Sequence, residues 1–336
     1  MELTQEQTSA IKGMAILFML WHHLFVDTLD YGTFVNSLAV FGKVCVGLFL
    51  FVSGYGLTKQ FDKIEKHNIR NTILFVIRRY AKFFMSYWFC FIVVIMIGNI
   101  CGYTIAEAYP QGRNHYKCFL FDLFGCLGYE SYLSTWWFNK LIIQLYLFFP
   151  FLFLLLRKKV ATFLGLAIFF VVEQFNLLPF FFVIEGGLVA FYLGMIFGQW
   201  GKEWKVRHQE VAFWGCIALV VALISIRFEQ PEIRFMIVDG FIALGVGVII
   251  SLIGGKYGFP ILRFFGRYAT IMYLTHTLFH RLFGKYIYSL PFAPLCFLLL
   301  LAIATIAAMA IQKAQLLCRY DKLQAFILNK INDVKT

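Results

Sequence analysis

The chain has 336 residues, of which 61% are hydrophobic and only 14% are charged, and its formal net charge is +12. Soluble domains carry roughly 25% charged residues, so this composition, with a mean hydropathy of +0.75, excludes an ordinary soluble protein. The positive charge does not indicate a nucleic-acid ligand, because an excess of Lys and Arg on a membrane protein first reports its topology. We therefore predict an all-α polytopic protein whose partners include membrane lipids and no nucleic acid.

Apolar runs long enough to cross a bilayer recur along the whole chain. They cover residues 9–28, 38–58, 80–101, 133–156, 159–175, 179–200, 211–227, 234–253, 264–283 and 291–312. This pattern predicts about ten transmembrane helices. Most of the 30 Lys and Arg residues lie in segments that are internal if the N-terminus is cytoplasmic, which places both termini in the cytoplasm. We expect a single transmembrane domain over 1–336, without a cleaved signal peptide or an appended soluble domain.

The first apolar run, SAIKGMAILFMLWHHLFVD, carries Lys12 near its start and His22 and His23 near its end. Ionisable side chains at membrane depth cost roughly 2.5 kcal/mol or more and therefore usually mark function. Lys12 and His23 are eleven positions apart, which returns them to nearly the same helix face with about 16 Å of rise between them. This face predicts a cation at one membrane boundary and an imidazole near the midplane.

An imidazole, with an ordinary pKa near 6.5, suits a general base that takes a proton from a hydroxyl. Asp27 lies at i+4 from His23 and could accept its other N–H, or could be an interfacial carboxylate in water. His22 points about 100° away from His23 and is expected to pack or to form a hydrogen bond. The sequence leaves open that the two histidines exchange roles.

The second and third spans add hydroxyls and cations near the cytoplasmic boundary. Ser53 and Tyr55 lie in a glycine-rich stretch, VGLFLFVSGYGLTKQF, which could equally be a close helix contact. Arg78, Arg79 and Lys82 follow in IRRYAKFFMSYW. These three cations could bind a phosphate-rich ligand or anionic lipid head groups.

Most other polar residues within the spans fall near the midplane or in the outer half. They are Lys140, Gln144, Glu173, Gln174, Glu185, Asp239 and His276. With Trp136 and Trp137, they predict an outward-facing polar cavity suited to a carbohydrate. Structural roles are also open, since Lys140 could pair with Glu185 or Asp239, and His276 could bond to a neighbouring helix.

The cysteines and histidines show no spacing typical of a metal site, so no metal is expected. Cys101, Cys118 and Cys126 lie at or within the predicted outer loop, where one disulfide could form.

Five stretches, taken in order, carry a resemblance to a known family. They are Lys12-Gly13 followed by His23, FLFVSGYGL, RRYAKFFMSYW, TWWFNKLIIQLYLFFP and FFGRYATIMYLTH. Together, from about Lys12 to His276, they resemble the membrane-bound acyltransferase-3 family, the integral membrane O-acyltransferases of cell-surface glycans. The resemblance implies transfer of an acyl group, most often acetyl, from cytoplasmic acyl-coenzyme A to a sugar hydroxyl at the outer face of a bacterial plasma membrane.

The resemblance also implies roles for single residues. His23 matches the family's essential histidine, as general base or acyl carrier, and Lys12 takes the place of its usual arginine. Ser53 and Tyr55 match a serine-glycine-tyrosine motif. The donor's phosphates are expected to bind Arg78, Arg79 and Lys82, with help from Arg267.

The acceptor side departs furthest from the family pattern. Gln144 matches a family glutamine, but Asn139 and Lys140 lie where many members carry glutamates, and Met85 replaces a usual proline. A non-enzymatic transporter or flippase of a lipid-linked glycan would use the same outer cavity and is the main alternative. The sequence shows neither the paired discontinuous helices nor the repeat symmetry of many transporters, and it predicts no oligomeric state.

Overall fold

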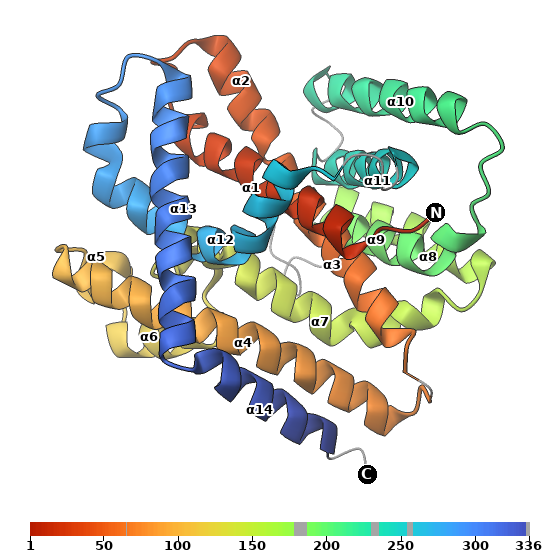
Figure 1. The fold of residues 1–336 in the computed structure, drawn as a ribbon, viewed down its shortest axis with the longest axis horizontal. Coiled ribbons are helices and arrows are strands. Elements are labelled where there is room, and N and C mark those ends of the chain that lie inside the picture. Colours follow the sequence, from red (N-terminus) through yellow and green to blue (C-terminus); the bar gives the residue numbers. More distant parts are fainter. Residues whose placement is uncertain (65, 178–186, 230–234, 254–257, 334–336) are drawn as a thin grey trace. The chain divides into compact units, whose positions relative to one another are not determined.

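The computed structural model describes residues 1–64, 66–177, 187–229, 235–253 and 258–333, and every regular element in these ranges is a helix (Figure 1). The longer helices are α1 (Gln5–Phe25), α2 (Thr33–Gly42), α3 (Val44–Phe61), α4 (Ile69–Ile100), α7 (Trp137–Leu155), α8 (Lys159–Gln174), α9 (Leu188–Trp200), α10 (Gln209–Glu229), α11 (Phe235–Ile253), α12 (Pro260–Ile287), α13 (Ala293–Leu317) and α14 (Tyr320–Asp333). The short ones are α5 (Ile105–Ala108), α6 (His115–Leu123), η1 (Gly128–Glu130), η2 (Ser134–Trp136) and η3 (Gly201–Glu203).

Six helical stretches in the described residues are long and apolar enough to cross a membrane. They are Thr33–Phe61, Ile69–Ile100, Ser134–Leu155, Gln209–Glu229, Phe235–Ile253 and Ala293–Leu317. The other predicted spans coincide with α1, α8, α9 and α12. Of these, α8 and α9 have only 16 and 13 residues, and α12 carries charged side chains such as Arg263 and Arg267. The protein is thus a multi-pass membrane protein, while the count of ten spans and the cytoplasmic termini stay predictions.

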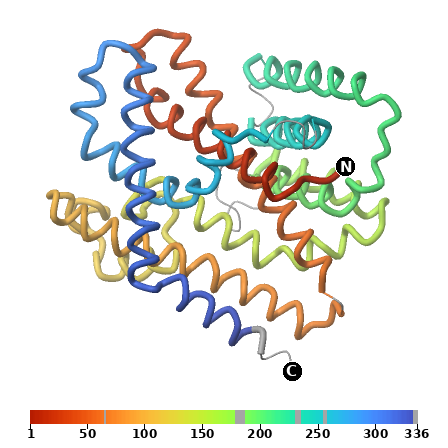
Figure 2. Tube along the Cα trace, viewed as in Figure 1, coloured from red at the N-terminus to blue at the C-terminus, as the bar shows by residue number. Residues whose placement is uncertain are grey.

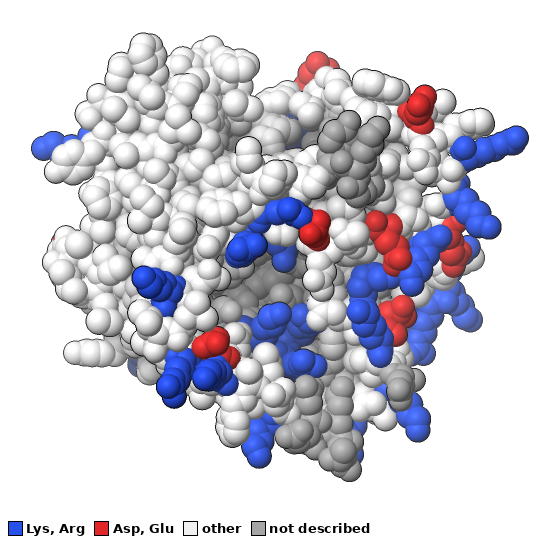
Figure 3. Space-filling model, viewed as in Figure 1, with Lys and Arg blue, Asp and Glu red and all other residues white. Residues whose placement is uncertain are grey.

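The chain divides into two compact units, each described here by itself. Unit 1 comprises residues 1–22, 37–65 and 149–269, and unit 2 comprises residues 23–36, 66–148 and 270–336. In Figure 3, lysine and arginine side chains are more prominent than acidic ones on the face in view, as the net charge of +12 leads one to expect.

The core of unit 1 is built where α3, α9 and α11 pack against one another. A methyl group added at Gly54 of α3 would clash with the carbonyl oxygen of Phe191, and one added at Gly194 of α9 would clash with that of Phe51. Only glycine permits this close backbone approach between membrane helices. The glycine-rich stretch of the second span is therefore a helix contact, one of the two alternatives left open by the sequence.

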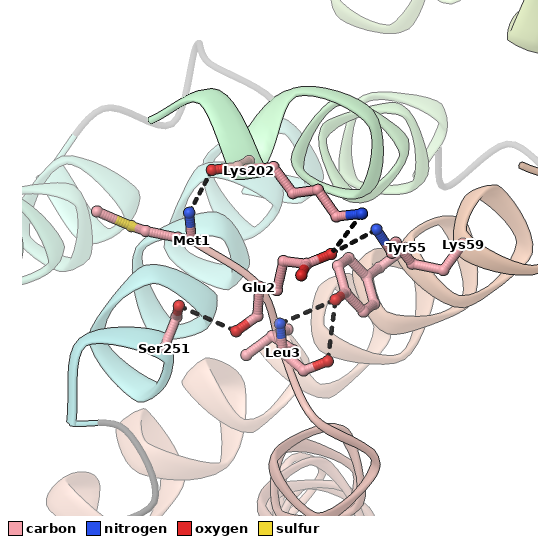
Figure 4. A network of polar contacts seen from close by, with 8 residues as sticks. Met1, Glu2, Leu3, Tyr55, Lys59, Lys202 and Ser251 are labelled. Carbon is pink, nitrogen blue, oxygen red and sulfur yellow. Dashed lines mark hydrogen bonds and ion pairs between the residues drawn. The ribbon is translucent and has the colours of Figure 1, made fainter. Parts of the chain in front are cut away.

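The segment before α1 is bound to the end of α3 by polar contacts (Figure 4). The Tyr55 hydroxyl donates to the Leu3 carbonyl at 2.9 Å and accepts from the Leu3 N–H at 2.8 Å. The Glu2 carboxylate lies 2.6 Å from the Lys59 Nζ and 3.6 Å from the Lys202 Nζ. The hydrogen bond from Lys59 lowers the pKa of Glu2. The Tyr55 hydroxyl of the serine-glycine-tyrosine motif thus binds the segment before α1 to α3. The sequence did not indicate this role.

In unit 2, the buried carboxylate of Asp122 organises the segment between α4 and α7. It accepts hydrogen bonds from the Tyr132 backbone N–H at 2.7 Å and from the Tyr109 hydroxyl at 3.0 Å. The Tyr87 hydroxyl of α4 donates to the backbone carbonyl of Asp122 at 2.7 Å. Burial raises the pKa of Asp122, and the hydrogen bond from Tyr132 opposes this shift. The carboxylate therefore ties three separate parts of this segment together.

We expect Asp122→Ala to lower the free energy of unfolding by roughly 2–4 kcal/mol, because it leaves buried donors without an acceptor. Asp122→Asn keeps one acceptor oxygen and should lose less. Thermal denaturation of the purified protein in detergent measures both changes. The control is Glu130→Ala, which removes an exposed ion pair with Arg113 and should cost about 1 kcal/mol or less. Equal melting temperatures for Asp122→Ala and Glu130→Ala would contradict this role.

Candidate active site

Two histidines from distant parts of the sequence meet in unit 2. The rings of His23, near the end of α1, and His276, in α12, have centroids 5.0 Å apart. His276 is fully buried, and its Nδ1 lies 2.9 Å from the Tyr273 carbonyl oxygen and 3.2 Å from that of Met272. Because a carbonyl oxygen only accepts, Nδ1 carries a hydrogen, and Nε2 lies 3.2 Å from the Thr277 hydroxyl. A buried imidazole with both ring nitrogens at hydrogen-bond distance from a partner therefore lies beside His23.

The polar contacts continue from α12 to α7. The hydroxyls of Thr277 and Thr135 are 2.8 Å apart, and the Tyr273 hydroxyl lies 3.0 Å from the Thr135 carbonyl oxygen and 3.2 Å from Asn139 Oδ1. Asn139 is fully buried, and its Nδ2 has no hydrogen-bond partner among the described residues. A buried polar atom without a partner costs about 1–3 kcal/mol and calls for an explanation such as a bound ligand or water. Asn139 therefore offers a free donor to a molecule bound at this site.

His22, next in sequence to His23, has the structural role expected of it. It belongs to unit 1, where its Nδ1 lies 2.8 Å from the Ala39 carbonyl oxygen of α2. The side chain is thus committed to a contact between α1 and α2.

Asp27 is not on the helical turn that follows His23, which corrects the sequence prediction. The structure ends α1 at Phe25 and places Asp27 in an exposed turn. The side-chain amide of Asn36 donates to the carbonyl oxygens of Phe25 and Val26 at 3.0 and 2.9 Å, and so satisfies groups that a longer helix would bond internally. Asp27 would lie one turn beyond His23 only if α1 continued past Phe25, and the Asn36 amide ends the helix there.

In unit 1, the start of α1 crosses the start of α12 at close range. A methyl group at Gly13 would clash with the Leu262 carbonyl oxygen, and one at Gly266 would clash with that of Ser9. Lys12 lies beside this crossing and is exposed. The two glycines therefore allow the N-terminal parts of both helices to pack closely.

A cavity of about 460 Å³ lies at this crossing. Its lining residues are Gln5, Glu6, Ser9, Pro260, Arg263, Phe264 and Arg267. The first turns of α1 and α12 both reach it, and helix N-termini favour anions. Arg263 Nη1 lies 2.5 Å from Glu6 Oε2, while Arg267 is exposed. Two guanidinium groups and one carboxylate line the cavity, which is therefore electropositive. The sequence analysis did not include Arg263 among the candidate phosphate-binding residues.

The basic cluster of α4 lies in unit 2. Arg78 and Lys82 are exposed, whereas Arg79 is half-buried, with its guanidinium carbon 5.0 Å from the Phe75 ring centroid. This stacking holds the guanidinium group of Arg79 against an aromatic ring. Ser53, in unit 1, is half-buried on α3.

Asp239 has a partner that the sequence did not indicate. Arg227 Nε, from the last turn of α10, lies 2.6 Å from Asp239 Oδ1 of α11, and both side chains are buried. The guanidinium carbon is 5.4 Å from the ring centroids of Phe41 and Phe235. This pair replaces the suggested pairing of Asp239 with Lys140. The two residues are 12 positions apart and lie on different helices, so no helical spacing in the sequence indicates the pair.

Trp136 belongs to the hydrophobic core of unit 2, in contrast to its predicted contact with a sugar. It is 1% exposed, and its Nε1 donates to the Leu274 carbonyl at 3.0 Å. Its ring centroid lies 5.3 Å from that of Tyr87 and 5.5 Å from that of Phe91. No ring face is left for stacking. Trp137 is also nearly buried and stacks on Tyr129, with centroids 5.4 Å apart.

The remaining predicted polar residues differ in their surroundings. Lys140 is half-buried, and Gln144 Oε1 is a buried acceptor without a partner among the described residues. Glu173 accepts from the backbone N–H groups of Gly187 and Val189 at 2.8 and 2.9 Å, and so caps the start of α9. Glu185 lies outside the described residues.

No group of three or more His, Cys, Asp or Glu side chains in the described ranges could hold a metal ion. All eight cysteines are described, and each is a free thiol, so Cys101, Cys118 and Cys126 form no disulfide in the structure.

A family model for an acyltransferase domain matches residues 9–312, which include α1 to α13 apart from their outermost ends. The chain belongs to the acyltransferase-3 family. No curated protein and no solved structure matches it. As a family member with several apolar helices, the protein is a membrane acyltransferase. The histidine pair, Asn139 and the two cavity arginines, Arg263 and Arg267, all lie within the matched residues.

Proposed function

We propose that this acyltransferase-3 protein moves an acyl group, with acetyl as the expected group, from cytoplasmic acyl-coenzyme A to a hydroxyl of a cell-surface or exported carbohydrate. We place it in the plasma membrane of a bacterium. The observation that carries the proposal is the buried polar network around His23 and His276 inside an acyltransferase-3 domain.

His23 is the catalytic residue in this proposal. A sugar hydroxyl is a weak nucleophile at neutral pH, and His23 would take its proton as the oxygen attacks the thioester carbonyl carbon. The carbon–sulfur bond then breaks, and the thiolate of coenzyme A leaves and regains a proton. The same residue could instead carry the acyl group between the two substrates. Lys12 supplies a cation at the inner end of the same helix, and Asp27 lies in the turn beyond it.

His276 supports His23 by packing beside it. Its Nδ1 is bound by helix carbonyls and its Nε2 by Thr277, so the ring is held in one orientation. The free amide donor of Asn139, in the same network, suits a bound hydroxyl or the oxygen that gains charge in the transition state. The half-buried Lys140 and the unpartnered Gln144 oxygen support an acceptor site on the same helix.

The donor's phosphates have two sets of candidate ligands. One is the electropositive cavity of unit 1, with Arg263 and Arg267. The other is the α4 cluster of Arg78, Arg79 and Lys82 in unit 2. Coenzyme A carries a diphosphate and a further phosphate, and arginine binds phosphate through two parallel N–H donors. We also assign Ser53 to the donor site, because it belongs to the same serine-glycine-tyrosine motif as Tyr55.

We expect Arg267→Gln to raise KM for acetyl-coenzyme A about tenfold, as the loss of one charge-assisted phosphate contact implies, with little change in kcat. Steady-state kinetics of the purified protein measures this. Arg113→Gln, which removes an exposed arginine paired with Glu130, is the matched control. An unchanged KM for Arg267→Gln, or an equal rise for both variants, would remove the cavity from the donor site.

The proposed reaction is tested by supplying labelled acetyl-coenzyme A to membranes that contain the protein. We expect alkali-labile label in the carbohydrate fraction, because an O-acyl ester is cleaved by mild base. Membranes without the protein give the background. A transporter or flippase would consume no acyl-coenzyme A, so the absence of ester label, together with movement of a lipid-linked glycan, would favour that alternative.

A further inference from the structure

One face of the last helix, α14, is packed against α4 within unit 2. The Tyr320 hydroxyl donates to the Met85 carbonyl at 2.7 Å, and Gln324 Nε2 donates to the Lys82 carbonyl at 3.4 Å. The rings of Tyr320 and Phe89 have centroids 4.9 Å apart. Figures 1 and 2 both show α14 lying along α4. The face centred on Tyr320 and Gln324 is therefore already occupied by protein.

A second face of α14 is exposed and combines apolar and basic side chains. At about 100° per residue, Lys322, Leu323, Phe326 and Lys330 form a continuous stripe that points away from α4. Leu323 is 48% exposed and Phe326 is 59% exposed, while both lysines are exposed. The acidic Asp321 lies on the opposite flank. We call these four residues the α14 stripe.

The α14 stripe begins close to the end of a membrane span. Helix α13 is apolar enough to cross the bilayer, and it ends at Leu317. Arg319 then adopts a left-handed backbone conformation, with φ of 53°, and α14 starts at Tyr320. Leu316 and Leu317 are 58% and 75% exposed, so exposed apolar side chains continue from the span into α14. This short connection keeps the start of α14 close to the membrane surface.

We propose that α14 is an interfacial helix whose α14 stripe binds anionic phospholipid. Leu323 and Phe326 enter the boundary between head groups and acyl chains, while Lys322 and Lys330 contact the negatively charged head groups. An amphipathic helix with lysines beside its apolar residues has the composition for this position. A purely aqueous environment would leave two large apolar side chains in water, and a neutral lipid surface would leave the lysines without complementary charge. By its contacts with Met85 and Lys82, α14 holds α4 close to the same membrane surface.

The test uses the full-length protein in lipid nanodiscs that contain lipids with brominated acyl chains, which quench tryptophan fluorescence on contact. Phe326→Trp reports from the α14 stripe. Ala325→Trp, at an exposed position on the flank that carries Asp321 and outside the stripe, is the matched control. The emission of the wild-type protein is subtracted from each. We expect the added tryptophan at position 326 to be quenched severalfold more than the one at position 325.

The role of the lysines is tested in the same system. Lys322→Gln with Lys330→Gln, introduced beside Phe326→Trp, should reduce the quenching in nanodiscs with anionic lipid and leave it unchanged in neutral lipid. Equal quenching at positions 326 and 325 would overturn the proposal, since the α14 stripe would then have no preferential contact with the acyl chains. Quenching at position 326 that depends neither on the lysines nor on anionic lipid would overturn the recognition of head groups. Unchanged melting temperatures show that the variants are folded.

Discussion

We expect His23→Gln to lower kcat for acyl transfer about 10³-fold, because a general base contributes roughly 10²–10⁴-fold to such a reaction. Glutamine keeps a polar side chain beside His276 and cannot take the proton. The protein should still fold, and donor binding should remain, since His23 does not contribute to the arginine cavity. Turnover of acyl-coenzyme A and the melting temperature measure the two effects separately.

The control for His23→Gln is the same change at the neighbouring position. His22→Gln removes a contact with the Ala39 carbonyl and should cost some stability while leaving most of the activity. The opposite pattern, with transfer lost in His22→Gln and kept in His23→Gln, would show that the two histidines exchange their proposed roles.

The second large effect is on stability. Asp239→Leu leaves the Arg227 guanidinium buried without its carboxylate, and we expect a loss of about 3–5 kcal/mol in the free energy of unfolding. The phenylalanine rings around Arg227 cannot replace that charge. Denaturation in detergent measures the loss.

The double variant Arg227→Met with Asp239→Leu removes both charges at once and should regain most of the lost stability, because apolar side chains of similar size often replace a buried ion pair without cost. A double variant that is as unstable as Asp239→Leu alone would show that the loss comes from packing and not from the unpaired charge.

The helical class and the position of most apolar helices could be predicted from the sequence, because membrane helices need long runs without charge. The histidine of α1 was singled out for the same reason, as a polar group where apolar ones are expected. Its neighbour His276 was noted only as one of several outer polar residues. That the two rings meet is a consequence of packing between elements more than 250 residues apart, which no local pattern encodes.

The failures have local physical causes. Asp27 was assigned a place on α1, but the amide of Asn36 ends that helix two residues earlier. Trp136 was predicted to bind the acceptor because aromatic rings stack on sugar rings. An aromatic ring packs equally well in a hydrophobic core, and Trp136 packs against Tyr87. In the sequence, Asn139 is only a departure from the family pattern, and the structure alone shows that its amide nitrogen is buried without a partner among the described residues.

The central claim is that the protein uses acyl-coenzyme A and that His23 performs the chemistry. The most direct test is the binding and turnover of labelled acetyl-coenzyme A by the purified protein in detergent, for the wild type and for His23→Gln. We predict saturable binding by both proteins and turnover by the wild type alone. Failure of the wild type to bind any acyl-coenzyme A, or undiminished turnover by His23→Gln, would contradict the account.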